Sequence, residues 1–221
     1  MTPVIAKTIK YVTLVIGSIV ALLPLTVILM ASLKTRQELE QGGPFDFPSS
    51  PQWGNYATFF IRGKALEGFM NTGIILVFSI LGTVIIGTMA AYAIDRFEFR
   101  FRKSIVMLFL LATLVPGVTT QVATFRVVHA LGAYNTRMAP ILLFMGTDII
   151  SIHNEFYIPF LYMPSRNLPV ISTALFRFKG PYAASWQVIS AGIIIVVIPT
   201  LIIFLLLQRH IYNGLTQGAV K

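Results

Sequence analysis

The stretch that decides the fold is YVTLVIGSIVALLPLTVILMASL, residues 11–33, which lies between Lys10 and Lys34. It holds 23 residues without a charge. This is long enough for a membrane span, because a helix crosses the hydrocarbon core of a bilayer with roughly 20 apolar residues. The run is continuous, without the alternation of a membrane β-strand, and therefore predicts a spanning helix. It is longer than the core of a secretory signal and no cleavage site of small residues follows, so an uncleaved anchor is expected.

Three further charge-free runs have the same character. They cover residues 68–94, 104–125 and 180–208, which are 27, 22 and 29 residues long. Together with the first run they predict spans near 11–33, 73–94, 104–125 and 188–207.

A fifth segment, residues 138–163, is apolar but contains Asp148, His153 and Glu155. Its 26 residues would reach about 39 Å as a helix, which suffices for one tilted crossing and not for two. The sequence therefore predicts an all-α, multi-pass transmembrane helical bundle of about five spans. No linker divides it, so residues 1–221 are expected to form a single transmembrane domain.

The composition excludes most soluble functions. Only 11% of the residues are charged, against about 25% in soluble domains, so a soluble enzyme, a disordered chain and a nucleic-acid binder are not expected. The absence of cysteine excludes disulfide scaffolds, thiolate zinc sites and thiol catalysis. No glycine-rich phosphate loop with a Lys-Ser or Lys-Thr end occurs, so the chain itself is not expected to bind ATP. We expect neither catalysis nor a cofactor.

The charges predict an orientation for the first spans. The sequence DRFEFRFRK, residues 95–103, holds four basic residues in nine positions, so this loop and the N-terminus are expected in the cytoplasm. The loop 34–72 then lies outside. Beyond it the charges decide nothing: if 138–163 spans, nine basic residues lie inside and eight outside, and if it re-enters, the numbers are reversed. The side of the C-terminus stays open.

Six local strings, in this order over nearly the whole chain, resemble carbohydrate-importing ABC permeases of the maltose-transporter type. They are PQWGNY (51–56), NT (71–72), AYAIDRF (91–97), LGAYNT (131–136), NEFYIP (154–159) and GLTQGAVK (214–221). The resemblance implies a subunit with six spans in the bacterial inner membrane. It also implies pairing with a second permease subunit, two ABC ATP-binding subunits, and an extracytoplasmic sugar-binding protein.

The chain departs from that family where the coupling loop is expected. Such permeases carry a cytoplasmic Glu-Ala-Ala…Gly loop, a short helix that docks into the ATPase subunit, between the fourth and fifth spans. Here the sequence passes from GTDIISI (146–152) directly into HNEF (153–156). We interpret this as an internal deletion near residues 152–153, which predicts impaired docking and poor coupling to ATP hydrolysis.

The same segment holds the candidate substrate-pathway residues: Asp148, Asn154, Glu155, Phe156 and Tyr157. Asp148 and Glu155 are seven residues apart, which places both carboxylates on one helical face. A carboxylate at the bilayer centre costs about 2.5–3.5 kcal/mol on insertion scales and usually faces a watery path. The alternative for Glu155 is simple solvation at the membrane edge, and for the aromatic rings packing in an interfacial belt.

Two local features refine this expectation. Pro159 cannot donate to the carbonyl four residues earlier, that of Glu155, so the chain should kink there and free an acceptor for a sugar hydroxyl. His153 lacks a second histidine at i+4, so no metal site is expected.

The sequence therefore favours a permease subunit of an ATP-driven carbohydrate importer, uncoupled by loss of its docking loop. A non-transporting truncated membrane remnant is the second hypothesis. A proton-driven transporter that uses Asp148 and Glu155 as a relay is the third, although no inverted repeat supports it.

Overall fold

The computed structural model describes residues 3–114, 117–145, 155–180 and 184–219. All regular secondary structure in this part of the chain is helical, apart from an isolated bridge between Lys179 and Ala184. Its helices are α1 (Pro3–Ser32), α2 (Arg36–Gln41), α3 (Gly54–Arg62), α4 (Ala65–Arg96), α5 (Arg102–Leu114), α6 (Gly117–Ala130), α7 (Met138–Phe144), α9 (Tyr157–Tyr162), α10 (Ile171–Ala174), the 3-10 helix η1 (Leu175–Phe178) and α11 (Trp186–Ala219).

Among the described residues, three helices are long and apolar enough to cross a membrane. They occupy Lys7–Ser32, Ala65–Arg96 and Trp186–Arg209. These helices confirm the all-helical fold, and they contain nearly all of the predicted spans 11–33, 73–94 and 188–207.

Within the other two predicted spans, the described residues form shorter helices. The segment 104–125 falls on α5 and α6, either side of residues 115–116. Its sequence carries Pro116 followed by Gly117, which both disfavour a continuous helix. The segment 138–163 contributes α7 and α9, with residues 146–154 outside the described part.

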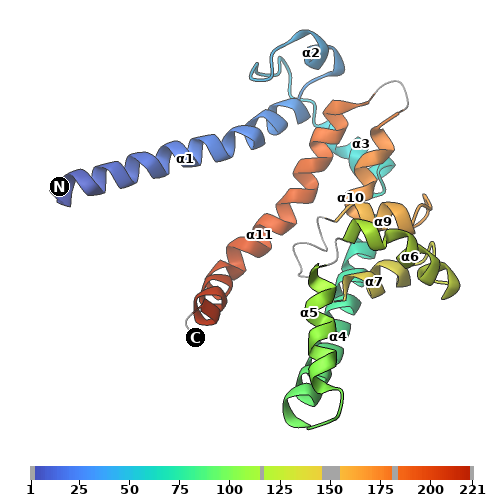
Figure 1. The fold of residues 1–221 in the computed structure, drawn as a ribbon. Coiled ribbons are helices and arrows are strands. Elements are labelled where there is room, and N and C mark those ends of the chain that lie inside the picture. The colour runs from blue at the N-terminus through green and yellow to red at the C-terminus, as the bar shows by residue number, and fades with distance from the viewer. Residues whose placement is uncertain (1–2, 115–116, 146–154, 181–183, 220–221) are drawn as a thin grey trace. The chain divides into compact units, whose positions relative to one another are not determined.

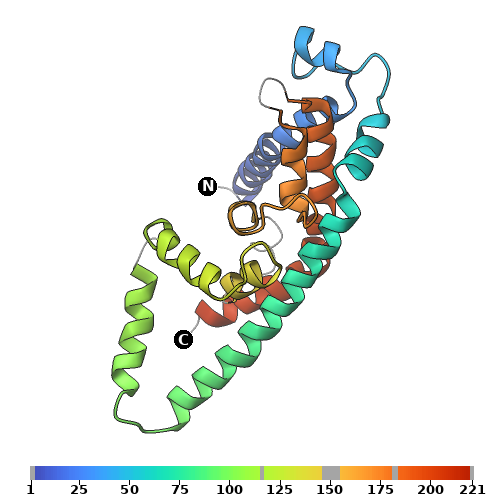
Figure 2. The ribbon, with the colours of Figure 1, turned by 90° about the vertical axis from the view of Figure 1, so that its right-hand side faces the viewer.

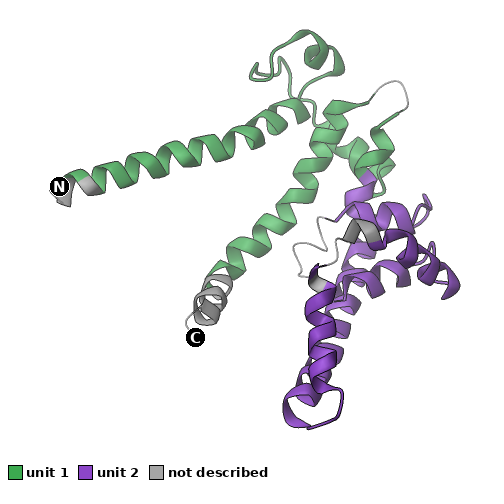
Figure 3. Ribbon diagram, viewed as in Figure 1, with its two compact units in different colours: residues 1–65, 175–221 green, residues 66–174 purple. Residues whose placement is uncertain are grey.

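The chain divides into two compact units (Figure 3), residues 1–65 with 175–221, and residues 66–174. In the first unit the C-terminal end of α1 lies beside α11, and the two helices diverge from there (Figure 1). The helix α3 packs on α11 through Phe59, which is completely buried. This contact requires Gly192, because a Cβ there would overlap the Phe59 ring and lie 2.6 Å from Leu175 Cδ2.

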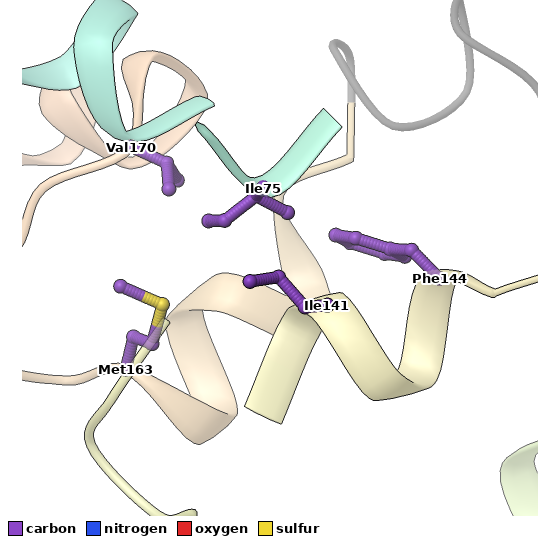
Figure 4. Packing of buried hydrophobic residues seen from close by; sticks show 5 residues of the cluster. All are labelled: Ile75, Ile141, Phe144, Met163 and Val170. Atoms are coloured by element: carbon purple, nitrogen blue, oxygen red, sulfur yellow. The ribbon is translucent and has the colours of Figure 1, made fainter. Parts of the chain in front are cut away.

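The second unit is built along α4. Figure 2 shows that α5 turns back after α4 and runs at an angle to it. One core cluster of this unit joins Ile75 of α4 to Ile141 and Phe144 of α7, with Met163 and Val170 (Figure 4). A second cluster holds Val128, Ala133, Ala139 and Tyr162.

Buried polar side chains tie the second unit together. Asn71 donates from Nδ2 to the Pro169 carbonyl (2.6 Å) and accepts from Arg137 Nε at Oδ1 (2.8 Å). The hydroxyl of Thr72 accepts from the Ile171 amide (3.1 Å). The pair 71–72 therefore joins α4 to residues almost 100 positions later in the chain, a role that the sequence did not reveal.

Candidate functional site

The candidate site surrounds the start of α9, where Glu155, Phe156 and Tyr157 lie within the described residues. Glu155 is half-buried, and its Oε1 accepts hydrogen bonds from the amides of Tyr157 (2.8 Å) and Ile158 (3.3 Å). The first amides of a helix lack partners within the helix and attract negative charge. The carboxylate thus caps α9, and its other oxygen has no hydrogen-bond partner among the described residues.

The carbonyl of Glu155 is free of the helix, as Pro159 predicts, but it is not exposed to a ligand. Ser172 at the start of α10 donates its hydroxyl to this carbonyl (2.6 Å). The expectation of a vacant acceptor for a sugar hydroxyl is therefore wrong in this conformation. A buried carbonyl without a partner is costly, and the chain satisfies it from the neighbouring helix.

The two aromatic side chains of the site have different surroundings. Phe156 stacks on Phe160, with ring centroids 5.1 Å apart. Tyr157 is 45% exposed and donates from its hydroxyl to Gln121 Oε1 (2.8 Å) on α6. Tyr162 also reaches Gln121, at the backbone carbonyl (3.5 Å).

Gln121 is thus a member of the site that sequence reasoning missed. It lies in the charge-free run 104–125, and a glutamine within such a run is the one signal that could have indicated a polar role. Among the described residues, the side chain of Gln121 makes one hydrogen bond, the one that its Oε1 accepts from the Tyr157 hydroxyl.

A crevice adjoins Glu155 but does not admit a ligand. The residues that line it are Thr72, Ile75, Phe144, Glu155, Pro159, Val170 and Ser172. Its walls approach so closely that no water molecule fits between them, whereas ligand sites usually enclose about 300–1,000 Å³. The crevice beside Glu155 is therefore closed to ligands in this conformation.

The remaining predicted residues, Asp148 and Asn154, lie outside the described residues, as does His153. The predicted pair of Asp148 and Glu155 therefore stays a prediction. Among the residues that it does describe, no group of three His, Asp or Glu side chains could hold a metal ion.

Comparison with known proteins connects this architecture to one class of transporter. No family model matches the chain. A probable starch degradation products transport permease, AmyC of Thermoanaerobacterium thermosulfurigenes, is 27% identical, and the alignment covers 96% of this chain and 97% of the relative. The melibiose/raffinose/stachyose import permease MelC of Bacillus subtilis is 22% identical over 97% of this chain and 98% of its own length.

A solved structure shares the fold of this chain. A crystal structure of a bacterial ABC transporter that imports the acidic polysaccharide alginate superposes with a TM-score of 0.73, at 15% identity, over 93% of this chain and 96% of the matched chain. At that identity the likeness establishes the fold alone. The distant relatives over nearly the full length, the shared fold and the three membrane-length helices among the described residues agree: the chain is a distant homologue of carbohydrate ABC transporter permeases and has the fold of an ABC transporter membrane subunit.

Proposed function

We propose that this permease forms part of the translocation pathway for a neutral oligosaccharide in an ATP-driven importer. The observation that carries the proposal is the near full-length similarity to permeases named for starch degradation products and for melibiose, raffinose and stachyose. In such an importer the chain would pair with a second permease subunit, with two ATP-binding subunits and with an extracytoplasmic sugar-binding protein. It performs no catalysis itself.

The pathway residues in this proposal are Asp148, Asn154, Glu155, Phe156 and Tyr157. The chemistry around α9 supports the last three, because a carboxylate, a stacked ring and a hydrogen-bonded phenol occupy consecutive positions there. Amide, carboxylate and hydroxyl groups pair with sugar hydroxyls, and flat rings cover the apolar face of a sugar. Gln121 joins this set through Tyr157.

Loss of the coupling loop is the second part of the proposal. The alignment with AmyC extends over 274 positions, which exceeds the 221 residues of this chain by 53. At least that many positions of the alignment therefore face no residue here, which supports an internal deletion. The proposed deletion point, residues 152–153, lies outside the described residues.

Reconstitution tests both parts. The chain is assembled in proteoliposomes with its partner permease, ATP-binding subunits and sugar-binding protein. ATP hydrolysis is measured with and without raffinose, and raffinose uptake is measured alongside it. We expect the complex to assemble but sugar to stimulate hydrolysis weakly. Grafting the Glu-Ala-Ala loop of a relative between residues 152 and 153 should restore stimulation, and a Gly-Ser insert of equal length should not.

The outcomes separate the alternatives. Normal sugar-stimulated hydrolysis by the ungrafted chain would refute uncoupling but leave the permease role intact. Assembly of the complex without sugar uptake, even after grafting, would favour the truncated remnant. The 53 unmatched alignment positions support that alternative as well. Uptake that continues without ATP would support the proton-driven alternative.

A further inference from the structure

A polar pocket in the first unit has no role in the function proposed above. It is a hollow of about 360 Å³, wide open to solvent, between α2 and residues 49–52. The charges predict that this loop lies outside the cytoplasm. Its lining residues are Thr35, Gln37, Glu38, Gln41, Ser49, Ser50 and Gln52. Its volume lies at the lower end of the range for ligand sites, about 300–1,000 Å³.

The walls of the pocket are held before any ligand arrives. Thr35 and Glu38 form a reciprocal capping box at the start of α2. The Glu38 carboxylate also accepts from the Ser49 amide (2.9 Å) and from the Ser49 hydroxyl. These hydrogen bonds lower the pKa of Glu38 to about 2, and the bond with the Ser49 hydroxyl contributes most. The carboxylate therefore stays ionised and joins the two walls at all ordinary pH values.

The pocket is also anchored to the end of α1. The backbone N–H of Gln52 donates to the Leu33 carbonyl (2.8 Å), and its side-chain Nε2 donates to the Ser50 carbonyl (3.1 Å). Lys34 is almost completely buried and donates to the Gly43 carbonyl (2.8 Å). A preformed site avoids much of the ordering free energy that binding otherwise requires.

The lining selects one ligand chemistry. Among the described residues that line it, none is basic, so an anion gains no ion pair, and none is aliphatic or aromatic, so an apolar ligand gains little. The single carboxylate is already engaged, and hard cations need several oxygen ligands of this kind. Gln37 and Gln41, on one side of α2, offer amide donors and acceptors that no hydrogen bond in the described structure uses.

We propose that this pocket is a binding subsite for one ring of a neutral carbohydrate, distinct from the α9 site. Sugar hydroxyls both donate and accept, and the amides of Gln37 and Gln41 and the hydroxyl of Ser50 match them. The proposal rests on the proposed function for the class of substrate. The position of the pocket in the external loop suits a ring that is held before it enters the membrane.

Direct binding tests the subsite without the ATPase. The full chain is placed in phospholipid nanodiscs, since glycoside detergents would themselves occupy a sugar site. Maltotriose and raffinose are titrated separately by saturation-transfer NMR, with a trigalacturonate as the charged probe of equal ring number. We expect saturable binding of at least one neutral probe and none of the charged one.

The variant Q37A/Q41A should weaken that binding at least tenfold. Glu40→Ala is the matched control, because Glu40 lies on the same helix but outside the pocket and pairs with Arg36 at the surface, and it should change the affinity less than twofold. Gln41→Trp, which fills the pocket, should abolish binding in protein whose helical circular dichroism is unchanged.

The result that would overturn the subsite is undiminished binding in both pocket variants, or no binding of either neutral probe. Equal binding of the charged probe would contradict the chemistry assigned to it. If sugar binding at this pocket is not observed but ATP-driven uptake persists, only the subsite proposal is refuted. If sugar still binds at the pocket but uptake is absent even after loop grafting, the result counts against the proposed function instead.

Discussion

The helix α1 and the short helices α7 and α9 are similarly apolar but have opposite surroundings. No residue in the most apolar window of α1 is buried, and Val20, for example, is 63% exposed. By contrast, Phe144 of α7 is 3% exposed and Tyr162 of α9 is 2% exposed. Lipid is as apolar as leucine, so a long helix needs no protein cover in a bilayer.

The short helices cannot use lipid in this way. The helix α7 has 7 residues and α9 has 6, far fewer than the roughly 20 needed to cross the hydrocarbon core. They are held by close packing on α4 and by buried hydrogen bonds such as those of Asn71. Hydropathy therefore indicates which helices meet lipid, and steric fit and polar pairing hold the rest.

The largest expected effect tests whether α1 is exposed to lipid, which is the first half of this comparison. Val20→Asp puts a carboxylate in the middle of the lipid-exposed α1 and should raise its insertion free energy by about 3 kcal/mol. A glycosylation-mapping assay of membrane integration measures this. Lys7→Asp at the basic end of the helix is the control and should alter integration far less. Unchanged integration of the Val20 variant would show that α1 does not meet lipid.

Two glycines sharpen the contrast between open and packed helices. A Cβ at Gly17 of α1 meets nothing within 4 Å, whereas one at Gly192 of α11 overlaps Phe59. Gly192→Ala should therefore destabilise the first unit by about 2 kcal/mol through overpacking. Gly17→Ala should be neutral or slightly stabilising, because alanine favours the helix by roughly 0.5–1 kcal/mol. Thermal unfolding in nanodiscs compares them, and equal melting temperatures would contradict the α3–α11 contact.

The polar ties of the second unit can be broken one at a time. Asn71→Ala leaves the Pro169 carbonyl and Arg137 without their partner and should destabilise the unit by about 1–2 kcal/mol. Hydrogen exchange of residues 165–175 should rise in this variant. Asn167→Ala, an exposed asparagine in the same segment, should leave the exchange unchanged. Protection that survives Asn71→Ala would show that packing alone holds this segment.

The smallest expected effect concerns the external loop. Its hydrogen bonds hold the pKa of Glu38 at about 2, below the ordinary 4.5. The ionised group therefore stabilises the folded loop above pH 4.5, and this contribution is lost as the pH falls from 4.5 towards 2. Protection of the Ser49 amide from exchange should decline over that window. Glu38→Gln should remove the pH dependence, and an unchanged pH profile in this variant would disprove the link.

Sequence reasoning anticipated the helical fold and the long apolar helices, because continuous charge-free runs of that length are stable in lipid as helices. The family was anticipated separately, from the resemblance of six local strings. It did not anticipate that 104–125 falls on α5 and α6. It foresaw a carbonyl released by Pro159 but not that Ser172 would occupy it. It also missed Gln121, because the partner of Tyr157 lies 36 residues earlier and no local pattern links the two.

The sequence by itself determined which segments prefer lipid, since that preference is a sum of local transfer free energies over about 20 residues. Only the tertiary structure decided the closed crevice at Glu155, the tie made by Asn71 and the polar pocket beside α2. Each of these depends on side chains from different segments meeting at hydrogen-bonding distance. Composition and spacing do not encode such meetings, because they arise from how the helices pack.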